Sequence, residues 1–293
     1  MSKIICDDHI DILVDIAGHS HGNRLEMLAN KPAPIQILWP GFAGSTGIQG
    51  MDFIVADQWT IPEHEAGGYT EEPLRLPFCF TCFIKPDESP SSQIKPVQRP
   101  NELVFGCLSS MQFIGPNVIQ CWAKILESVP DSRLVIKNRE LSNDSVRERI
   151  SSLFIEYGIP FSRLLLEGED AADNASDLLE KIDVGLDPFP CSDFENAFQF
   201  LSRGVPVISK SGQRYAGNQT TSLLQNLGLT EFCVQTDEGY LQCARSVAND
   251  SSGLADLRLG LPQRVRSSRV CDVPKFVTDL QDLFSKALTQ RNR

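Results

Sequence analysis

The chain has 293 residues, of which 41% are hydrophobic and 22% are charged, as is usual for a globular protein with a sizeable core. Its formal net charge is −11, so it repels a polyanion on average, and nucleic acid is not an expected partner. A membrane is not expected either, because no stretch approaches the roughly 18–20 consecutive apolar residues of a spanning helix. Acidic residues interrupt the apolar N-terminal stretch, unlike a signal peptide, and we expect a cytoplasmic protein.

Residues 1–83 are expected to form a partial N-terminal Rossmann-like domain. Its strands are predicted at 12–16, 35–39 and 53–56, with a short helix at 23–30 and a strand and loop at 74–83. Glycine-bearing loops follow the first two strands and contain Gly18, Gly22, Gly41, Gly44 and Gly47. A strand, a glycine loop and a helix in succession present backbone N–H groups to a ligand in open α/β sheets.

Residues 84–101 are rich in proline, serine and charge and are the predicted linker. Residues 102–272 are expected to form a C-terminal Rossmann-like domain. Its strands are predicted at 103–106, 133–137, 164–167, 182–187, 205–209 and 232–235. Its helices are predicted to start near Pro116, to span 142–157, 194–202 and 220–227, and to end at 181. This alternation predicts an α/β fold with parallel sheets and right-handed crossovers.

Two helix details can be predicted from local sequence. Ser142 is expected to cap the helix that Gly158 ends. A C-terminal helix is expected in residues 273–293, and its apolar stripe is typical of a helix packed on a core. The stripe consists of Val277, Leu280, Phe284 and Leu288.

Metal sites are not favoured by the cysteine and histidine patterns. Nine cysteines are scattered along the chain. Cys79 and Cys82 have CxxC spacing, but no second pair of ligands stands nearby, so two reduced thiols are favoured over a zinc site. His19 and His21 could be metal ligands. They lie in a glycine loop without a partnered carboxylate, and a polar binding loop is the favoured interpretation.

A ligand of the second domain should meet the loops at the carboxyl ends of its strands. In the loop 106–116, hydroxyl and amide side chains precede a helix whose N–H groups could face an anion. The loops 167–173 and 187–196 are instead acidic, which disfavours a dianion without a metal. Their carboxylates could equally be helix caps and solvated turns. They are Glu167, Glu169, Asp170, Asp173, Asp187, Asp193 and Glu195.

Several motifs carry a specific resemblance. They are DILVDIAGHSHGNR (Asp11–Arg24), PAPIQILWPGFAGSTG (Pro32–Gly47), MDFIVAD (Met51–Asp57), VFGC (Val104–Cys107), WAKILESVPDSRLVIK (Trp122–Lys137), DVGLDPFP (Asp183–Pro190) and GVPVIS (Gly204–Ser209). Through them the chain resembles the C-terminal catalytic region of O-GlcNAc transferase and SPINDLY-like glycosyltransferases, as a divergent member. The resemblance implies a GT-B-like architecture of two Rossmann-like domains, the first one truncated here. It also implies a UDP-sugar donor, a Ser/Thr hydroxyl acceptor on a protein, and no metal or other cofactor.

The chain departs from that family at positions to which the resemblance assigns the chemistry. The family's diphosphate-contacting lysine corresponds to Phe113, and its nearby amide to Ser110. The phosphate-cradling threonine turn becomes 194–197, the acid expected on the ribose becomes Gln199, and the lysine and histidine of the base-recognition loop become Ala172 and Ala175. A histidine from the start of the family's first domain is also expected to be absent. No catalytic residue is therefore assigned.

Two functions remain open at this point. One is an O-GlcNAc-transferase-like glycosyltransferase with weak or lost activity. The other is a degenerate glycosyltransferase fold that serves as a binding or regulatory subunit for a partner protein. Candidate nucleotide-sugar-binding residues are Ser109, Ser110, Gln112, Phe113, Lys137, Ser192, Asp193, Phe194, Glu195, Asn196 and Gln199. Candidates in the acceptor-side loops are His19, Gly22, Arg24, Gly41 and Gly44.

Overall fold

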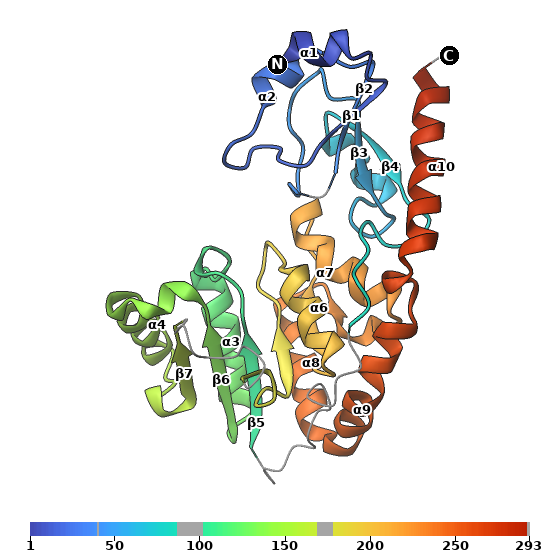
Figure 1. Ribbon diagram of the computed structural model, residues 1–293. Coiled ribbons are helices and arrows are strands. Elements are labelled where there is room, and N and C mark those ends of the chain that lie inside the picture. The colour runs from blue at the N-terminus through green and yellow to red at the C-terminus, as the bar shows by residue number, and fades with distance from the viewer. Residues whose placement is uncertain (40, 87–101, 169–177, 292–293) are drawn as a thin grey trace. The chain divides into compact units, whose positions relative to one another are not determined.

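The computed structural model describes residues 1–39, 41–86, 102–168 and 178–291 (Figure 1). Contacts divide the chain into two compact units. Unit 1 comprises Met1–Ile84, Gln213–Ser222 and Ser268–Arg293, and unit 2 comprises Lys85–Gly212 and Leu223–Ser267. Most of the predicted linker lies outside the described residues. So do Glu169, Asp170, Ala172, Asp173 and Ala175.

Unit 1 contains a four-stranded parallel sheet in the order β1-β2-β3-β4. The strands are β1 (Ile12–Asp15), β2 (Ile35–Leu38), β3 (Phe53–Ala56) and β4 (Glu72–Arg75). Every residue of β2 and β3 is buried. Strands of a parallel sheet that are covered on both faces are predominantly apolar, which explains the Val- and Ile-rich runs in the sequence.

Helix α10 (Val273–Arg291) covers one face of this sheet (Figure 1). Leu283 and Ala287 are its buried side chains in the core. The predicted stripe was only partly right: Leu280 and Phe284 pack on the core, but Val277 and Leu288 stay exposed. The other helical segments of unit 1 are short. They are α1 (Ser2–Asp7), α2 (Leu25–Ala29), η1 (Glu63–Gly68) and η7 (Arg269–Cys271).

Helix α7 (Tyr215–Asn226) contributes its first two thirds, up to Ser222, to unit 1. Tyr215 donates a hydrogen bond from its hydroxyl to the Val55 carbonyl at 3.3 Å, and its backbone N–H donates to the Tyr69 hydroxyl at 2.9 Å. The sequence prediction began this helix at Thr220, five residues too late. Its first turn is polar and glycine-containing, so apolar periodicity appears only in the second half.

Unit 2 contains a six-stranded parallel sheet in the order β10-β9-β8-β5-β6-β7. Its strands are β5 (Leu103–Cys107), β6 (Ser132–Lys137), β7 (Leu164–Glu167), β8 (Val184–Leu186), β9 (Val207–Lys210) and β10 (Cys233–Val234). Both sheets are parallel, so the predicted α/β class is confirmed.

The helices of unit 2 contact one another in the order α4, α3, α8, α9 and α6. They are α3 (Pro116–Ser128), α4 (Asp144–Glu156), α6 (Phe194–Ser202), α8 (Asp237–Asn249) and α9 (Ser251–Ser267), with the short segments η3 (Met111–Phe113), η4 (Arg139–Ser142), η5 (Phe161–Arg163) and η6 (Thr230–Phe232). The cap predicted at Ser142 was wrong, because the Asn143 side chain accepts the Ser145 N–H. No helix within the described ranges is both long and apolar enough to cross a membrane.

Candidate functional site

The strand order of unit 2 reverses at β5, which pairs with β6 on one side and β8 on the other. Ligands of open α/β sheets bind at the carboxyl ends of the strands, next to such a reversal. The loops that follow β5, β6 and β8 therefore form the candidate site. The first contains Ser109, Ser110, Gln112 and Phe113, and the third contains Ser192 and Asp193.

Two hydrogen bonds join the loop after β5 to the loop after β6. Asn138 donates from Nδ2 to the Ser109 carbonyl at 3.1 Å, and Ser110 donates from its hydroxyl to Glu140 Oε1 at 2.8 Å. Within the second loop, Asn138 Oδ1 accepts the Leu141 N–H at 3.1 Å. The hydrogen bond from Ser110 is the main reason why the pKa of Glu140 lies below its ordinary value. The Ser110 hydroxyl already donates its proton to a carboxylate. An incoming phosphate would have to compete with Glu140 for this hydrogen bond.

The loop after β8 is organised by Asp187, which is 3% exposed. Its Oδ1 accepts the Asp193 N–H at 2.8 Å, and its Oδ2 accepts the Ser209 hydroxyl at 2.6 Å. The Tyr240 hydroxyl lies 3.0 Å from the carbonyl oxygens of both Asp187 and Ile208, to which it donates. Asp187 thus fixes the loop that leads into α6 and is not presented to a ligand.

The N-terminus of α6 is occupied by the chain's own carboxylate. Asp193 is the N-cap, and its Oδ1 accepts the Asn196 N–H at 3.2 Å while its Oδ2 accepts Asn196 Nδ2 at 2.7 Å. The same Nδ2 lies 3.3 Å from the Leu108 carbonyl and donates to it. Asn196 therefore links the loops after β5 and β8 across the strand reversal. Glu195 adds an exposed carboxylate in the first turn.

The remaining predicted residues of unit 2 lie around these loops with different exposures. Phe113 and Phe194 are partly buried, whereas Gln112 and Gln199 are exposed. Lys137, at the end of β6, is 8% exposed and Ser192 is 6% exposed. An open surface depression beside this edge is lined by Arg139, Glu140, Ser142, Asn143 and Val146. The structure thus brings together the three loops but does not present Lys137 freely to solvent.

The predicted acceptor-side residues lie in unit 1, in the loops after β1 and β2. His19 donates from Nε2 to the Thr46 carbonyl at 2.9 Å. Arg24 folds back and donates from Nη1 to the carbonyls of Gly22 and Asn23 at 2.8 and 3.0 Å. Arg24 is exposed, so its cation is available at the surface of this loop.

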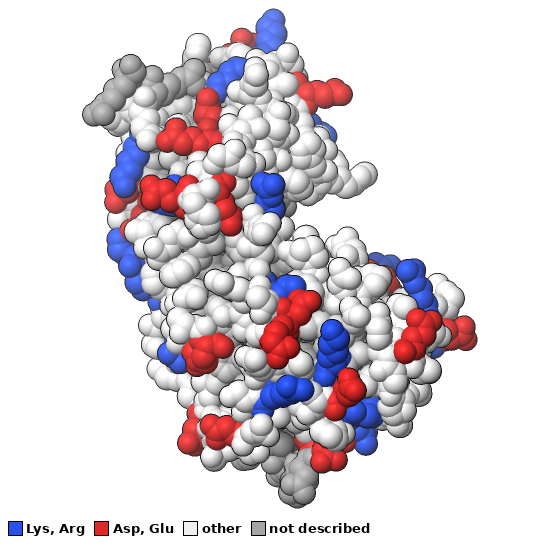
Figure 2. Space-filling view, turned by 180° about the vertical axis from the view of Figure 1, so that it is seen from behind, with Lys and Arg blue, Asp and Glu red and all other residues white. Residues whose placement is uncertain are grey.

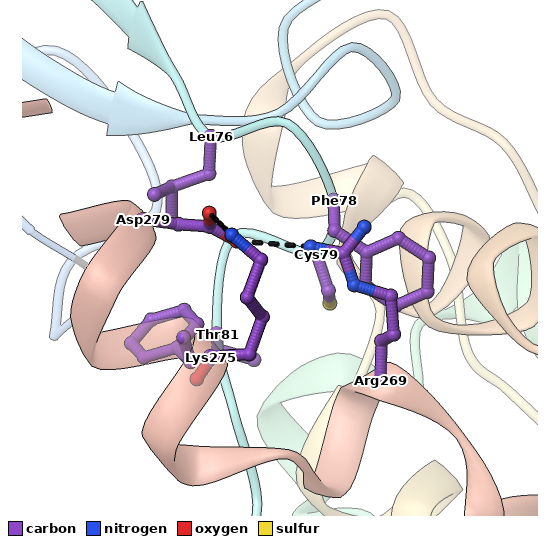
Figure 3. A pocket seen from close by; sticks show the side chains of 8 residues that line it. Leu76, Phe78, Cys79, Thr81, Arg269, Lys275 and Asp279 are labelled. Atoms are coloured by element: carbon purple, nitrogen blue, oxygen red, sulfur yellow. Dashed lines mark hydrogen bonds and ion pairs between the residues drawn. The ribbon is translucent and has the colours of Figure 1, made fainter. Parts of the chain in front are cut away.

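Elsewhere among the described residues we find no metal site, and a cavity in unit 1 is too small for a substrate. No group of three or more His, Cys, Asp or Glu side chains suited to a metal is found among these residues. The cavity lies where Arg269 and Lys275 both pair with Asp279 (Figure 3). Its volume is about 10 Å³, room for one water. Burial raises the pKa of the adjoining Cys79 to about 12, so this thiol is a poor nucleophile.

Charges on the surface are mixed. On the face shown in Figure 2, basic and acidic side chains of the described residues alternate, and the blue atoms form no continuous field. A polyanion therefore meets no extended basic surface on that face.

Comparison with protein-family models matches residues 1–89 and 92–280 to glycosyl transferase family 41. The chain belongs to this family. The match covers both units, so the predicted relationship to O-GlcNAc transferase and SPINDLY-like proteins is confirmed.

Similar family 41 proteins are much longer than this chain. The probable UDP-N-acetylglucosamine–peptide N-acetylglucosaminyltransferase SPINDLY of Eustoma exaltatum subsp. russellianum is 32% identical over 286 residues, which are 96% of this chain and 31% of that protein. The SPINDLY protein of Arabidopsis thaliana is 31% identical over 97% of this chain and 31% of its own length. The chain therefore spans about a third of these curated relatives.

Solved structures agree with this assignment. A mutant of the Thermobaculum terrenum O-GlcNAc transferase matches 99% of this chain and 55% of its own, at 31% identity and a TM-score of 0.88. Anabaena Alr3699/HepE in complex with UDP, at 13% identity and a TM-score of 0.63, shares the fold alone. The predicted GT-B-like class is confirmed.

Sequence reasoning missed three residues that organise the candidate site. Asn138 directly follows β6, so the rule that was applied to the ends of β5 and β8 would have found it. Glu140 gave no signal, because its partner Ser110 is 30 residues away. Tyr240 lies in α8, a helix that was not predicted.

Proposed function

We propose that the chain is the catalytic region of a nucleotide-sugar-dependent glycosyltransferase that acts on peptide hydroxyl groups, with weak or lost sugar transfer. Membership of family 41 supports the reaction class. The names of the curated relatives support UDP-N-acetylglucosamine as donor and peptide as acceptor. We also propose a cytoplasmic location, in keeping with nine cysteines that form no disulfide among the described residues.

The chemistry explains why activity should be weak. Transfer forms a bond from the acceptor oxygen to the anomeric carbon, and negative charge develops on the departing nucleoside diphosphate. Cations or preorganised N–H and O–H donors must stabilise that charge, and each donor is typically worth about 3 kcal/mol of the barrier. A site that replaces such groups with carboxylates loses this stabilisation and also repels the ground-state diphosphate.

The observation that carries the proposal is the occupied N-terminus of α6. Asp193 takes up the Asn196 N–H and amide, and Glu195 adds a second negative charge beside them. A phosphate could reach these N–H groups only by displacing a carboxylate. Phe113, at the position that the family resemblance assigns to a lysine, supplies no compensating cation.

Calorimetric titration with UDP and UDP-N-acetylglucosamine tests the proposal. For the unmodified chain we expect a Kd of about 1 mM or weaker. The double variant Phe113→Lys/Asp193→Ser should bind UDP about a hundredfold more tightly than the unmodified chain, and about tenfold more tightly than a control that contains Asp193→Ser with the lysine elsewhere. The matched control is Gln112→Lys/Asp193→Ser, which adds the same charge one residue away. Micromolar UDP binding by the unmodified chain would contradict the proposal.

A second candidate function is a binding or regulatory subunit that does not transfer sugar. It is supported by the hydrogen bond from Asn196 to the Leu108 carbonyl, because this contact joins the two loops between which a nucleotide would have to enter. The two candidates differ in turnover. Slow transfer of labelled N-acetylglucosamine to a serine-containing peptide by the unmodified chain supports the enzyme. Absence of transfer, in a preparation that binds a protein partner stoichiometrically, supports the subunit.

A further inference from the structure

The two glycine loops of unit 1 interlock at the carboxyl ends of β1 and β2. Gly18 has a φ of +48°, and a Cβ at this position would lie 2.4 Å from the Phe42 side chain. A Cβ at Gly41 would lie 1.6 Å from the Ile16 carbonyl oxygen. Each loop therefore leaves room for the other only because glycine occupies these two positions.

A buried carboxylate fixes the second loop. Glu71 is 1% exposed, its Oε1 accepts the Thr46 N–H at 2.7 Å and also the Thr46 hydroxyl, and its Oε2 accepts the Ser45 hydroxyl at 2.6 Å. Hydrogen bonds to an ionised acceptor are among the strongest in proteins. These hydrogen bonds compensate for the cost of burying the Glu71 carboxylate. Because they hold both the backbone and the side chain of Thr46, the Thr46 carbonyl keeps a fixed direction.

That carbonyl determines which nitrogen of His19 carries a proton. His19 Nε2 lies 2.9 Å from the Thr46 oxygen, and a carbonyl oxygen can only accept, so Nε2 is the donor. In the neutral ring, Nδ1 then holds the lone pair. The ring also contacts Phe42 edge-on, with centroids 5.3 Å apart. His19 is exposed, so this lone pair is accessible to a ligand.

The backbone in front of His19 is held as well. Asp15, the last residue of β1, accepts the Gly18 N–H at 2.8 Å and the Ala17 N–H at 3.3 Å. Two carboxylates thus position the backbone on either side of the ring: Asp15 accepts from the loop after β1, and Glu71 accepts from the loop after β2. The imidazole of His19 is therefore held by an ordered backbone and not by a mobile loop tip.

We propose that His19 Nδ1 accepts the hydrogen bond of the acceptor hydroxyl, and that Glu71 is the positioning residue that acts through Thr46. This inference rests on the proposed peptide-hydroxyl acceptor and names the group that receives it. In the bound state the acceptor O–H donates to Nδ1, and this hydrogen bond makes the hydroxyl oxygen a better nucleophile.

Nitrogen-15 NMR of the histidine side chains tests the orientation without requiring turnover. The chain has only 4 histidines, which makes assignment feasible. For His19 we expect a protonated Nε2 and an unprotonated Nδ1, and for the exposed His64 a tautomer mixture. Glu71→Gln should move the two His19 nitrogens toward mixed values, and Thr46→Val should do so to a smaller extent. Glu72→Gln, the exposed neighbour, should leave them unchanged.

A peptide titration on the same sample tests the ligand class. A serine-containing peptide at millimolar concentration should shift the His19 Nδ1 resonance, and the same peptide with alanine in place of serine should not. The proposal is overturned by a His19 tautomer mixture, by Glu71→Gln without effect on His19, or by equal responses to the two peptides. Titration with UDP reports on unit 2 separately, so its outcome distinguishes a failed donor site from a failed acceptor group.

Discussion

Ser222 donates a hydrogen bond to the carboxylate of Asp57, although the two residues are 165 positions apart in the chain. Asp57 is fully buried at the end of β3 and also accepts the N–H groups of Trp59, Thr60 and Phe80 at 2.7–2.8 Å. This carboxylate therefore holds the part of α7 that belongs to unit 1, and the segment after β4, against the sheet of unit 1.

Replacement of Asp57 by asparagine should destabilise unit 1. The amide has one acceptor oxygen, so its NH₂ group would face the N–H of Phe80 or the hydroxyl of Ser222. We expect a loss of about 1–3 kcal/mol in the free energy of unfolding, measured by urea denaturation. Asp11→Asn, at an exposed carboxyl before β1, is the control and should change stability by less than about 0.5 kcal/mol. Equal effects of the two changes would contradict this role.

The same carboxyl should give a recognisable pH dependence. Burial raises the pKa of Asp57 above its ordinary value of 3.8. The native state then binds the proton more tightly than the unfolded state. Proton binding by Asp57 therefore stabilises the native state fully below the pKa of Asp57 in the unfolded chain. This stabilisation is lost as the pH rises through the pKa of Asp57 in the folded chain. The stability difference between the unmodified chain and Asp57→Asn should therefore grow as the pH is lowered from neutrality toward the ordinary pKa of 3.8. A difference that shrinks over this range refutes the assignment.

Helix α9 contains one buried and one exposed arginine, whose replacement should affect stability very differently. Arg258 is 3% exposed and pairs with Asp183 at 3.0 Å, whereas Arg264 is exposed and donates to the Gly228 carbonyl. Arg258→Met removes the cation beside the buried Asp183 carboxylate and should cost about 3–5 kcal/mol of unfolding free energy. Arg264→Met should cost at most about 1 kcal/mol. Thermal unfolding measures both, and Arg258→Met/Asp183→Asn should recover part of the loss.

The occupied N-terminus of α6 can be tested by single changes. Asp193→Ser keeps a capping hydroxyl but removes the charge, so UDP affinity should rise by about tenfold, equivalent to about 1.4 kcal/mol. Glu195→Gln removes a charge without a hydrogen bond to the helix N-terminus, and it should raise affinity less. Calorimetry at one fixed salt concentration compares them. A larger effect at Glu195 would show that overall charge, and not the cap, limits binding.

Because the two glycine loops of unit 1 approach each other closely, position 41 should tolerate only glycine. A methyl group there would collide with the Ile16 carbonyl, and backbone has to move to relieve it. We expect Gly41→Ala to cost about 1–3 kcal/mol of unfolding free energy. Gly67, in η1, has open space around its Cβ direction, and Gly67→Ala should be nearly neutral. Chemical denaturation of both variants checks the contrast.

Strands with dense apolar runs were predicted well. Phe53–Ala56 and Leu164–Glu167 have the expected limits, because a short β-branched or aliphatic run bounded by polar residues leaves few alternatives. Helix α6 also has the expected limits. Helices α8 and α9 were missed, and α9 contains Pro262 and two glycines, which hide its periodicity.

The chemistry of the candidate site was only partly visible in the sequence. Acidic residues before α6 could be read as helix caps or as ligand-facing groups, and the residue type alone does not decide between them. The structure makes Asp193 a cap and Asp187 a partner of Ser209. Such assignments depend on contacts between segments that are distant in the chain, for which local patterns hold no information.

Unit 1 is assembled from three separate stretches of the polypeptide, and its core needs Leu283 and Ala287 from the last of them. During synthesis, the sheet β1-β2-β3-β4 leaves the ribosome long before α10 exists. All of unit 2 is translated in the meantime, so it can fold first. A nascent chain stalled before residue 273 should therefore expose an uncovered apolar sheet face and attract chaperones.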